Sequence, residues 1–258
     1  MALAVKQPGS YIAKHVYRLA ETIDVGHFKA SWEQTVQLCS NLRTRIVMNE
    51  GASLQVVIDN DISWDETSDL SLAAYLDEEL VMEYGSRLSR YTIVGDSNGP
   101  KYFVWTAHHA VIDGWTVQIN LETLQRIYNN RPAPTLQPYA NFINYIRQLD
   151  QQAAADYWIS ELEGAQRPTF PPAGPLFQAA ASDTSATRVL NTRIAFPSFD
   201  KSSITKPSVL RAAWAIILGR YSDTDDVCFG VTTSGRQAPV QGLLDMAGPA
   251  ICTLPVRI

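Results

Sequence analysis

The sequence predicts a mixed α/β chain, an α+β arrangement with a mixed sheet, folded as two lobes. Stretches with the period of a strand alternate with stretches with the period of a helix along most of the 258 residues. Between Gly164 and Thr187, residues rich in proline, glycine and alanine interrupt this alternation. Such a composition cannot hold a regular helix and is typical of a connection. We therefore expect a first lobe at 1–164, a connection at 165–187 and a second lobe at 188–258.

The first lobe is expected to contain both kinds of element. Its strands are runs of alternating or β-branched apolar residues, expected at Tyr11–Leu19, Leu42–Met48, Leu54–Ile58, Arg87–Val94 and Tyr102–Ala107. Its helices carry apolar residues three and four positions apart, expected at Val25–Ser40, around Leu72–Leu80, from the residue after Gly114 to about Asn129, at Tyr139–Leu149 and at Gln151–Leu162. The second and third strands form an expected hairpin, and the last two strands form another expected pair.

The second lobe is shorter. We expect a strand at Arg188–Phe196, a helix at Pro207–Arg220 and a strand at Val227–Thr233. The helix has Thr205 placed to cap it and Pro207 in its first turn, where a missing backbone N–H costs nothing.

Composition excludes several classes of protein. A content of 46% apolar and 18% charged residues is that of a globular chain, and a net charge of −5 offers no general attraction to nucleic acid or to an anionic membrane. No apolar run approaches the ~20 residues of a membrane span, and the first residues lack the apolar core of a signal peptide. The cysteines Cys39, Cys228 and Cys252 are scattered, which predicts buried, reduced thiols in a cytoplasmic protein.

The segment His108–Gly114 has the richest chemistry of the chain, with two histidines, an aspartate and a glycine in seven residues. It follows a predicted strand and precedes a predicted helix. Side chains of adjacent strand residues point to opposite faces, so we expect one histidine in a cleft and the other packed inward. A histidine titrates near neutral pH and can act as a general base.

The residues alone leave three interpretations of this segment open. In the first, a histidine is catalytic. In the second, Asp113 only caps the following helix. In the third, His108, His109 and Asp113 bind a metal, but such a site needs a further, distant ligand that the sequence does not indicate.

The segment resembles the active-site signature His-His-x-x-x-Asp-Gly of nonribosomal peptide synthetase condensation domains, which are related to chloramphenicol acetyltransferase. Other segments resemble the same family, in the same order along the chain: Leu42–Thr44, Tyr157–Leu162, Gly230–Arg236 and Cys252–Arg257. Cys252 stands where the family commonly has asparagine. The resemblance implies the two-lobe fold of chloramphenicol acetyltransferase, with the second lobe only partly present in this chain.

The resemblance also implies a reaction. The amine of an aminoacyl thioester attacks an acyl or peptidyl thioester, and both substrates are tethered to the phosphopantetheine arms of carrier domains. His109 acts as base or orients the amine and stabilises the intermediate, Gly114 supplies a backbone amide, and His108 has a structural role. Asp113 is expected to pair with Arg43. The implied partners are upstream and downstream peptidyl carrier domains and an adenylation domain, with no cofactor or metal bound by the domain itself.

Three further residues are candidates for the substrate tunnel or the lobe junction. Trp115 lines the tunnel or, as we expect, packs under the helix. Arg236 contacts a phosphopantetheine arm or, as we expect, braces the junction of the lobes. Ser234 lies beside Arg236 in the same motif and shares this region.

Alternative functions remain within and outside the family. A coenzyme A-dependent acyltransferase, an epimerisation domain and a terminal cyclising domain have similar motifs, and a non-catalytic domain that recruits partners is the alternative from another class. Because family members extend beyond Ile258, we expect this chain on its own to be weakly active or inactive.

Overall fold

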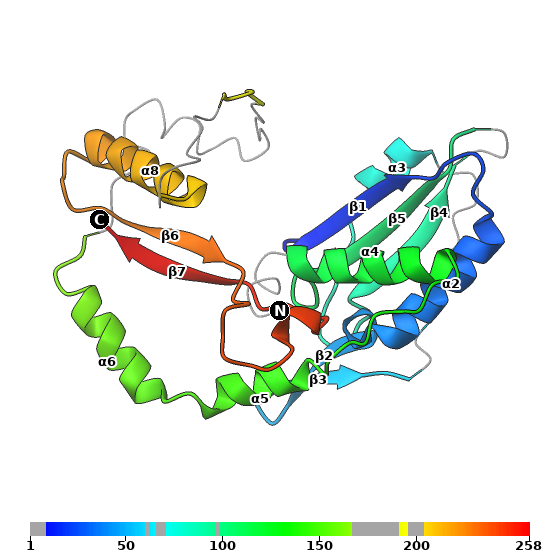
Figure 1. Ribbon diagram of the computed structural model, residues 1–258, viewed down its shortest axis with the longest axis horizontal. Helices are drawn as coiled ribbons and strands as arrows, with labels where there is room; N and C mark the ends of the chain where they lie inside the picture. Colours follow the sequence, from blue (N-terminus) through cyan, green and yellow to red (C-terminus); the bar gives the residue numbers. More distant parts are fainter. Residues whose placement is uncertain (1–8, 60–61, 66–70, 96–98, 167–190, 196–203) are drawn as a thin grey trace. The chain divides into compact units, whose positions relative to one another are not determined.

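The computed structural model describes residues 9–59, 62–65, 71–95, 99–166, 191–195 and 204–258 (Figure 1). The chain divides into two compact units, and the mixed α/β prediction is confirmed. The first unit contains Met1–Leu149 and Ser234–Ile251, and the second contains Asp150–Thr233 and Cys252–Ile258. This division differs from the expected boundary at 164. The first unit ends earlier, at a junction without proline or glycine, and the segment 234–251 belongs to it through long-range contacts that composition does not reveal.

The first unit is built on a three-stranded antiparallel sheet. Its order is β1 (Ile12–Arg18), β5 (Tyr102–His108) and β4 (Ser89–Val94), with Ile12 opposite His108. The predicted pair of β4 and β5 is confirmed. The pairing of β1 with the other edge of β5 places the end of β5 in the middle of the sheet.

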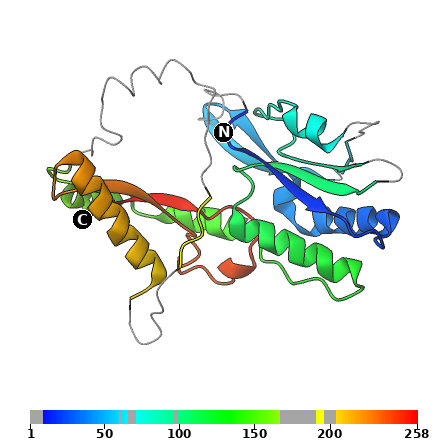
Figure 2. The same cartoon turned by 90° about the horizontal axis from the view of Figure 1, so that it is seen from above.

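Helices cover both faces of this sheet. Helices α2 (Val25–Leu38) and α4 (Gly114–Tyr128) pack together on one face, and α3 (Leu72–Asp77) lies on the other, as Figure 2 shows. The main core lies under α2 and α4, where Trp32 of α2 contacts the rings of Phe103 and Trp105. On the opposite face, Tyr75 of α3 packs on Val104 of β5. Alternate residues of β5 therefore face different helices, as a strand requires.

A second group of elements completes the first unit. The 3₁₀ helix η1 (Ser40–Arg43) leads into the predicted hairpin of β2 (Thr44–Asn49) and β3 (Ala52–Val57), which is confirmed. Helix α5 (Ala140–Gln148) packs on the segment 234–251, which includes the 3₁₀ helix η2 (Leu243–Asp245). The apolar contact is formed by the buried residues Phe142, Leu243, Met246 and Ala250.

The second unit contains α6 (Gln151–Glu161), α8 (Lys206–Ser222) and the antiparallel pair of β6 (Cys228–Thr233) and β7 (Cys252–Arg257). The predicted cap is confirmed, because Thr205 accepts a hydrogen bond from the backbone N–H of Ser208. The predicted strand at 188–196 is wrong for residues 191–195, which are exposed and form no strand; its remaining residues lie outside the described part of the chain.

The structure also bears on the burial of the cysteines and on membrane-spanning helices. Cys39 is buried as predicted, whereas Cys228 is half-buried and Cys252 is exposed, because a two-stranded ribbon leaves much of its surface open. Among the described residues, the structure contains no helix with the length and hydropathy needed to cross a membrane.

Candidate active site

The two histidines occupy different environments at the end of β5. His108 is the last residue of the strand, and only 2% of it is exposed. His109 begins the turn that follows, and its side chain is exposed. Its backbone N–H donates a hydrogen bond to the carbonyl oxygen of Tyr11 at 2.8 Å, which ties the turn to the residue that precedes β1. As expected, the two imidazoles therefore face different surroundings.

His108 is suited to hold the turn. Its Nδ1 accepts a hydrogen bond from the backbone N–H of Ala110 at 2.9 Å, and its carbonyl oxygen accepts one from Val111. Burial, with a smaller effect of the neighbouring His109, lowers the pKa of His108 from 6.5 to about 4. The imidazole is therefore neutral at physiological pH, which the acceptor role of Nδ1 also requires.

Asp113 is a buried carboxylate with hydrogen bonds on both oxygens. Oδ1 accepts from the backbone N–H and the hydroxyl of Thr116 at 2.7 and 2.6 Å, which caps α4. Oδ2 accepts from the backbone N–H groups of Ala250 and Ile251 at 2.8 and 3.3 Å. Burial by itself raises the pKa of Asp113, but the hydrogen bonds and the nearby Arg236 guanidinium outweigh it and hold the pKa below its ordinary value.

The ionic partner of Asp113 is Arg236. Its Nη2 lies 3.4 Å from both carboxylate oxygens, and both side chains are 3% exposed. The same guanidinium donates from Nη1 to the carbonyl oxygens of Leu243 and Met246, each at 2.8 Å, and from Nη2 to that of Gly248. Arg236 therefore holds the segment 243–248 and the carboxylate together.

The expected pairing of Asp113 with Arg43 is wrong. Arg43 donates to the carbonyl oxygens of Val36, Gln37 and Ile58 at 2.8–3.0 Å, and it forms an ion pair with the exposed Asp59 at 3.6 Å. Its guanidinium thus binds the last turn of α2, where unpaired carbonyls and the helix dipole attract a cation. Asp113 also caps a helix and pairs with an arginine at once, so the two interpretations of this residue are compatible.

The remaining predicted residues lie near the same network. Gly114 begins α4, so its backbone N–H is one of those that the helix leaves unused, and a Cβ added to it would meet nothing within 4 Å. Trp115 is 40% exposed, and its Nε1 donates to the carbonyl oxygen of Leu244 at 2.9 Å. It thus contacts η2 instead of packing beneath the helix. The exposed Ser234 accepts a weak hydrogen bond, at 3.4 Å, from the backbone N–H of Arg236.

Sequence reasoning missed two members of the network. Thr116 is fully buried, and its hydroxyl also donates to the carbonyl oxygen of Gly248 at 2.9 Å. Its position three residues after Asp113 is the spacing of a helix cap and is the signal that could have identified it. Tyr139 packs on Gly248 from the start of α5, and no local pattern in the sequence links these two residues.

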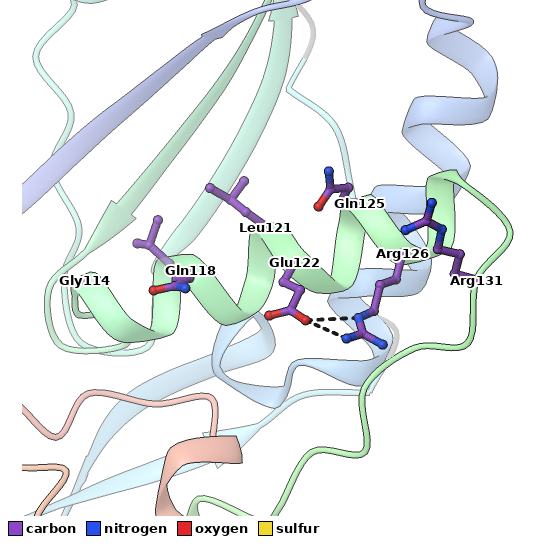
Figure 3. A pocket seen from close by; sticks show the side chains of 8 residues that line it. Gly114, Gln118, Leu121, Glu122, Gln125, Arg126 and Arg131 are labelled. Carbon is purple, nitrogen blue, oxygen red and sulfur yellow. Dashed lines mark hydrogen bonds and ion pairs between the residues drawn. The ribbon is translucent and has the colours of Figure 1, made fainter.

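Two hollows of the first unit border the motif. A groove of about 770 Å³ runs along the exposed side of α4 from Gly114 past Leu121 to Arg126 and Arg131 (Figure 3). In this groove Arg126 forms an ion pair with Glu122 at 2.8 Å. A second cavity of about 760 Å³ touches the motif at Ala110 and Val111, and is also lined by α5, the β2–β3 hairpin and residues 248–249.

The third interpretation of the motif finds no support in the described residues. In that part of the chain, no three histidine, cysteine, aspartate or glutamate side chains gather closely enough to hold a metal ion. The carboxylate of Asp113 is instead occupied by Thr116, Ala250, Ile251 and Arg236.

Comparison with known proteins places this arrangement in a family. The sequence model of the condensation domain matches residues 2–258. Among curated proteins, the chain is 36% identical over 260 residues to peramine synthetase A of Epichloe festucae (strain Fl1), and 39% identical over 263 residues to nonribosomal peptide synthetase TES of Alternaria alternata. Each alignment covers 100% of this chain but only 9% and 5% of the relative, so the chain spans less than a tenth of their length.

Solved structures share the fold. The crystal structure of holo T3CT matches with a TM-score of 0.73 and 21% identity, over 98% of this chain and 59% of that chain. The X-domain from teicoplanin biosynthesis matches with a TM-score of 0.68 and 19% identity, over 99% of this chain and 62% of that chain. At this identity the likeness concerns the fold alone, and the family rests on the match along the sequence. The chain belongs to the condensation domain family of the nonribosomal peptide synthetases.

Proposed function

We propose that this chain forms an amide bond between two carrier-tethered substrates, with His109 as the catalytic residue. The observation that carries the proposal is the contrast between the two histidines. His109 presents an exposed imidazole from a turn that is fixed at both ends, by the hydrogen bond of its own backbone to Tyr11 and by the buried pair of Asp113 and Arg236. A rigid turn with one accessible titratable group is suited to proton transfer.

The proposed reaction balances without a further reactant. The amine nitrogen of the acceptor attacks the carbonyl carbon of the donor thioester, so that a C–N bond forms and the C–S bond breaks. The nitrogen loses one proton, and the departing sulfur gains one. His109 takes the first proton, or orients the amine by a hydrogen bond and stabilises the tetrahedral intermediate.

The neighbouring residues support His109 without reacting. His108 stays neutral and holds the turn through Ala110. Gly114 begins α4, where an unused backbone N–H and the positive end of the helix dipole favour a developing negative charge. In this proposal the Gly114 amide binds the oxyanion of the intermediate.

We infer that both substrates arrive on phosphopantetheine arms of carrier domains, and that an adenylation domain supplies the acceptor. The relatives support this inference, because they are nonribosomal peptide synthetases of which the matching region is a small part. The groove borders the motif at Gly114 and the cavity borders it at Ala110 and Val111, so two separate hollows are open to two substrates.

The test replaces His109 with alanine in the full-length protein and measures amide formation with loaded donor and acceptor carriers. We expect the single-turnover rate to fall by about 10²- to 10⁴-fold, the usual contribution of a general base. His27→Ala is the matched control, because His27 is another exposed histidine of the first unit and lies on α2. An unchanged rate in the His109 variant would refute the catalytic assignment. Turnover with a coenzyme A thioester in place of the donor carrier would favour the acyltransferase alternative.

A further inference from the structure

Tyr139 makes two contacts with the segment that binds Asp113. Its hydroxyl donates a hydrogen bond of 2.5 Å to the carbonyl oxygen of Pro249. Its ring lies directly against Gly248, where a Cβ would be 2.4 Å from the ring carbons Cγ and Cδ2. The ring also packs on Phe142 of the same helix, with the ring centroids 5.9 Å apart. Tyr139 therefore packs on α5 and contacts residues 248 and 249.

The ring explains why residue 248 is a glycine. The backbone φ of Gly248 is not among the left-handed values of this chain, so its conformation is open to any residue. The obstacle to a side chain at this position is the ring of Tyr139. The two residues thus form a complementary pair, because the ring of Tyr139 occupies the space that a side chain at residue 248 would need.

Residues 248–250 form hydrogen bonds with the residues of the motif and its helix cap. The carbonyl oxygen of Gly248 accepts hydrogen bonds from Arg236 and from the Thr116 hydroxyl. Two residues later, the backbone N–H of Ala250 donates to Oδ2 of Asp113. A displacement of residues 248–250 would therefore weaken the ligands of Asp113 and release the first turn of α4.

We propose that Tyr139 is a positioning residue, which holds residues 248–250 against Asp113 and so fixes the turn that carries His109. The proposal rests on the proposed function, because it assigns Tyr139 an effect on the same reaction. Tyr139 acts through the segment and does not touch the reacting atoms.

The hydroxyl works as a hydrogen-bond donor and not as an acid or base. Burial, with a smaller contribution from Asp113, raises the pKa of Tyr139 to about 12. The phenol therefore keeps its proton at physiological pH, as the bond to the Pro249 carbonyl requires.

The first experiment removes only the hydroxyl. In the full-length protein, Tyr139→Phe should lower kcat for amide formation by about 3- to 10-fold, the effect of one lost hydrogen bond, with KM for both loaded carriers unchanged. Tyr145→Phe is the matched control, because Tyr145 lies on the same helix and its hydroxyl bonds to no described residue. An unchanged kcat, or an effect on KM alone, would overturn the proposal.

The second experiment tests the complementary pair. Gly248→Ala should lower kcat by at least about 10-fold, since its Cβ would displace the ring or the segment. In a Tyr139→Ala background, the same change at residue 248 should cost less than about 2-fold, because the obstructing ring is gone. Equal costs in both backgrounds would show that the ring does not set the position of Gly248.

Thermal unfolding of the wild type, Gly248→Ala, Tyr139→Ala and the double variant, combined with the activities of His109→Ala and Tyr139→Phe, separates this inference from the proposed function. If Gly248→Ala lowers Tm only when Tyr139 is present, while the His109→Ala variant still forms amide at the wild-type rate, the contact stands and the catalytic assignment fails. If His109→Ala abolishes the reaction and Tyr139→Phe leaves kcat unchanged, the catalytic assignment stands and the positioning role fails.

Discussion

At the scale of single residues, environment separates two histidines that the sequence presents as equals. His108 is buried, and its Nδ1 accepts a hydrogen bond from the backbone N–H of Ala110. His109, the next residue, is exposed. Alternation along a strand predicted that the two would differ. The direction of each side chain follows from the register of β5, in which His108 pairs with Ile12 of β1.

The burial of His108 predicts a pH dependence of stability. Its pKa is about 4 in the folded chain and 6.5 when unfolded, so between these values only the unfolded chain binds the proton. The free energy of unfolding should therefore fall as the pH drops from 6.5 to 4, by up to about 3 kcal/mol. Urea unfolding at pH 4.5, 5.5 and 7 measures this, and His108→Gln should reduce the dependence to what His15 contributes, whose pKa burial also lowers. His109→Gln should retain it; equal pH profiles for wild type and His108→Gln would contradict the prediction.

The carboxylate of Asp113 shows how far a residue's partner can lie from it in sequence. Arg236 is 123 positions away, while Arg43 was the partner expected from the resemblance. The sequence signal for Arg236 was its place in a Ser-Gly-Arg motif, which revealed neither the direction of its guanidinium nor its target.

A pair of double-mutant cycles checks this assignment. Asp113→Asn combined with Arg236→Met should show a coupling free energy of about 1–3 kcal/mol in urea unfolding, because both side chains are 3% exposed and in contact. Asp113→Asn combined with Arg43→Met should be additive within about 0.5 kcal/mol, because Arg43 binds carbonyls of α2 and of Ile58, the residue after β3. Coupling in the second cycle and additivity in the first would restore the expected pairing.

At the scale of elements, local patterns were reliable and distant pairings were not. The cap and the first-turn proline located α8 to within a residue at its start. The hairpin of β2 and β3 and the pair of β4 and β5 followed from short connections. The pairing of β1 with β5 joins residues far apart in the sequence, and no local signal specifies it.

The two strand errors have separate physical causes. The alternation near Arg193 suggested a strand, but residues 191–195 pair with no other strand and are exposed. β7 was not predicted because Pro255 interrupts it, and proline removes a ladder hydrogen bond. It is tolerated there because a two-stranded ribbon has only edge strands.

Within the segment 234–251, Gly235 shows why some contacts of the site cannot be predicted from sequence patterns. Its φ is +64°, and a Cβ would lie 1.8 Å from the carbonyl oxygen of Ala250. Glycine is thus required both by the backbone conformation and by the close approach of residue 250. The motif contains this glycine, but its contact with Ala250, which leaves no room for a side chain, is seen only in the fold.

At the scale of the whole molecule, the candidate site belongs to one compact unit that is assembled from two distant parts of the chain. Residues 108–116 supply the motif and the cap, and residues 236–251 supply the arginine and the backbone donors. The sheet and its helices alone do not complete the site. Residues 234–251 are therefore as much a part of this unit as the strands are.

This assembly predicts that residues 1–164 do not form a stable unit alone. Without residues 234–251, the buried Asp113 loses Arg236 and two backbone donors, and Phe142 of α5 loses its apolar cover. The loss of this apolar cover and of the hydrogen-bonded ion pair should cost about 3–5 kcal/mol, a large part of the stability of a domain. We expect the 1–164 fragment, followed by circular dichroism, to unfold at least about 10 °C below the full chain. A peptide of residues 234–251 should raise the Tm of this fragment.

The same peptide with Arg236→Leu should have a much smaller effect, because it restores the apolar contact without the cation. A fragment that melts cooperatively at the temperature of the full chain would place the boundary near residue 164 after all.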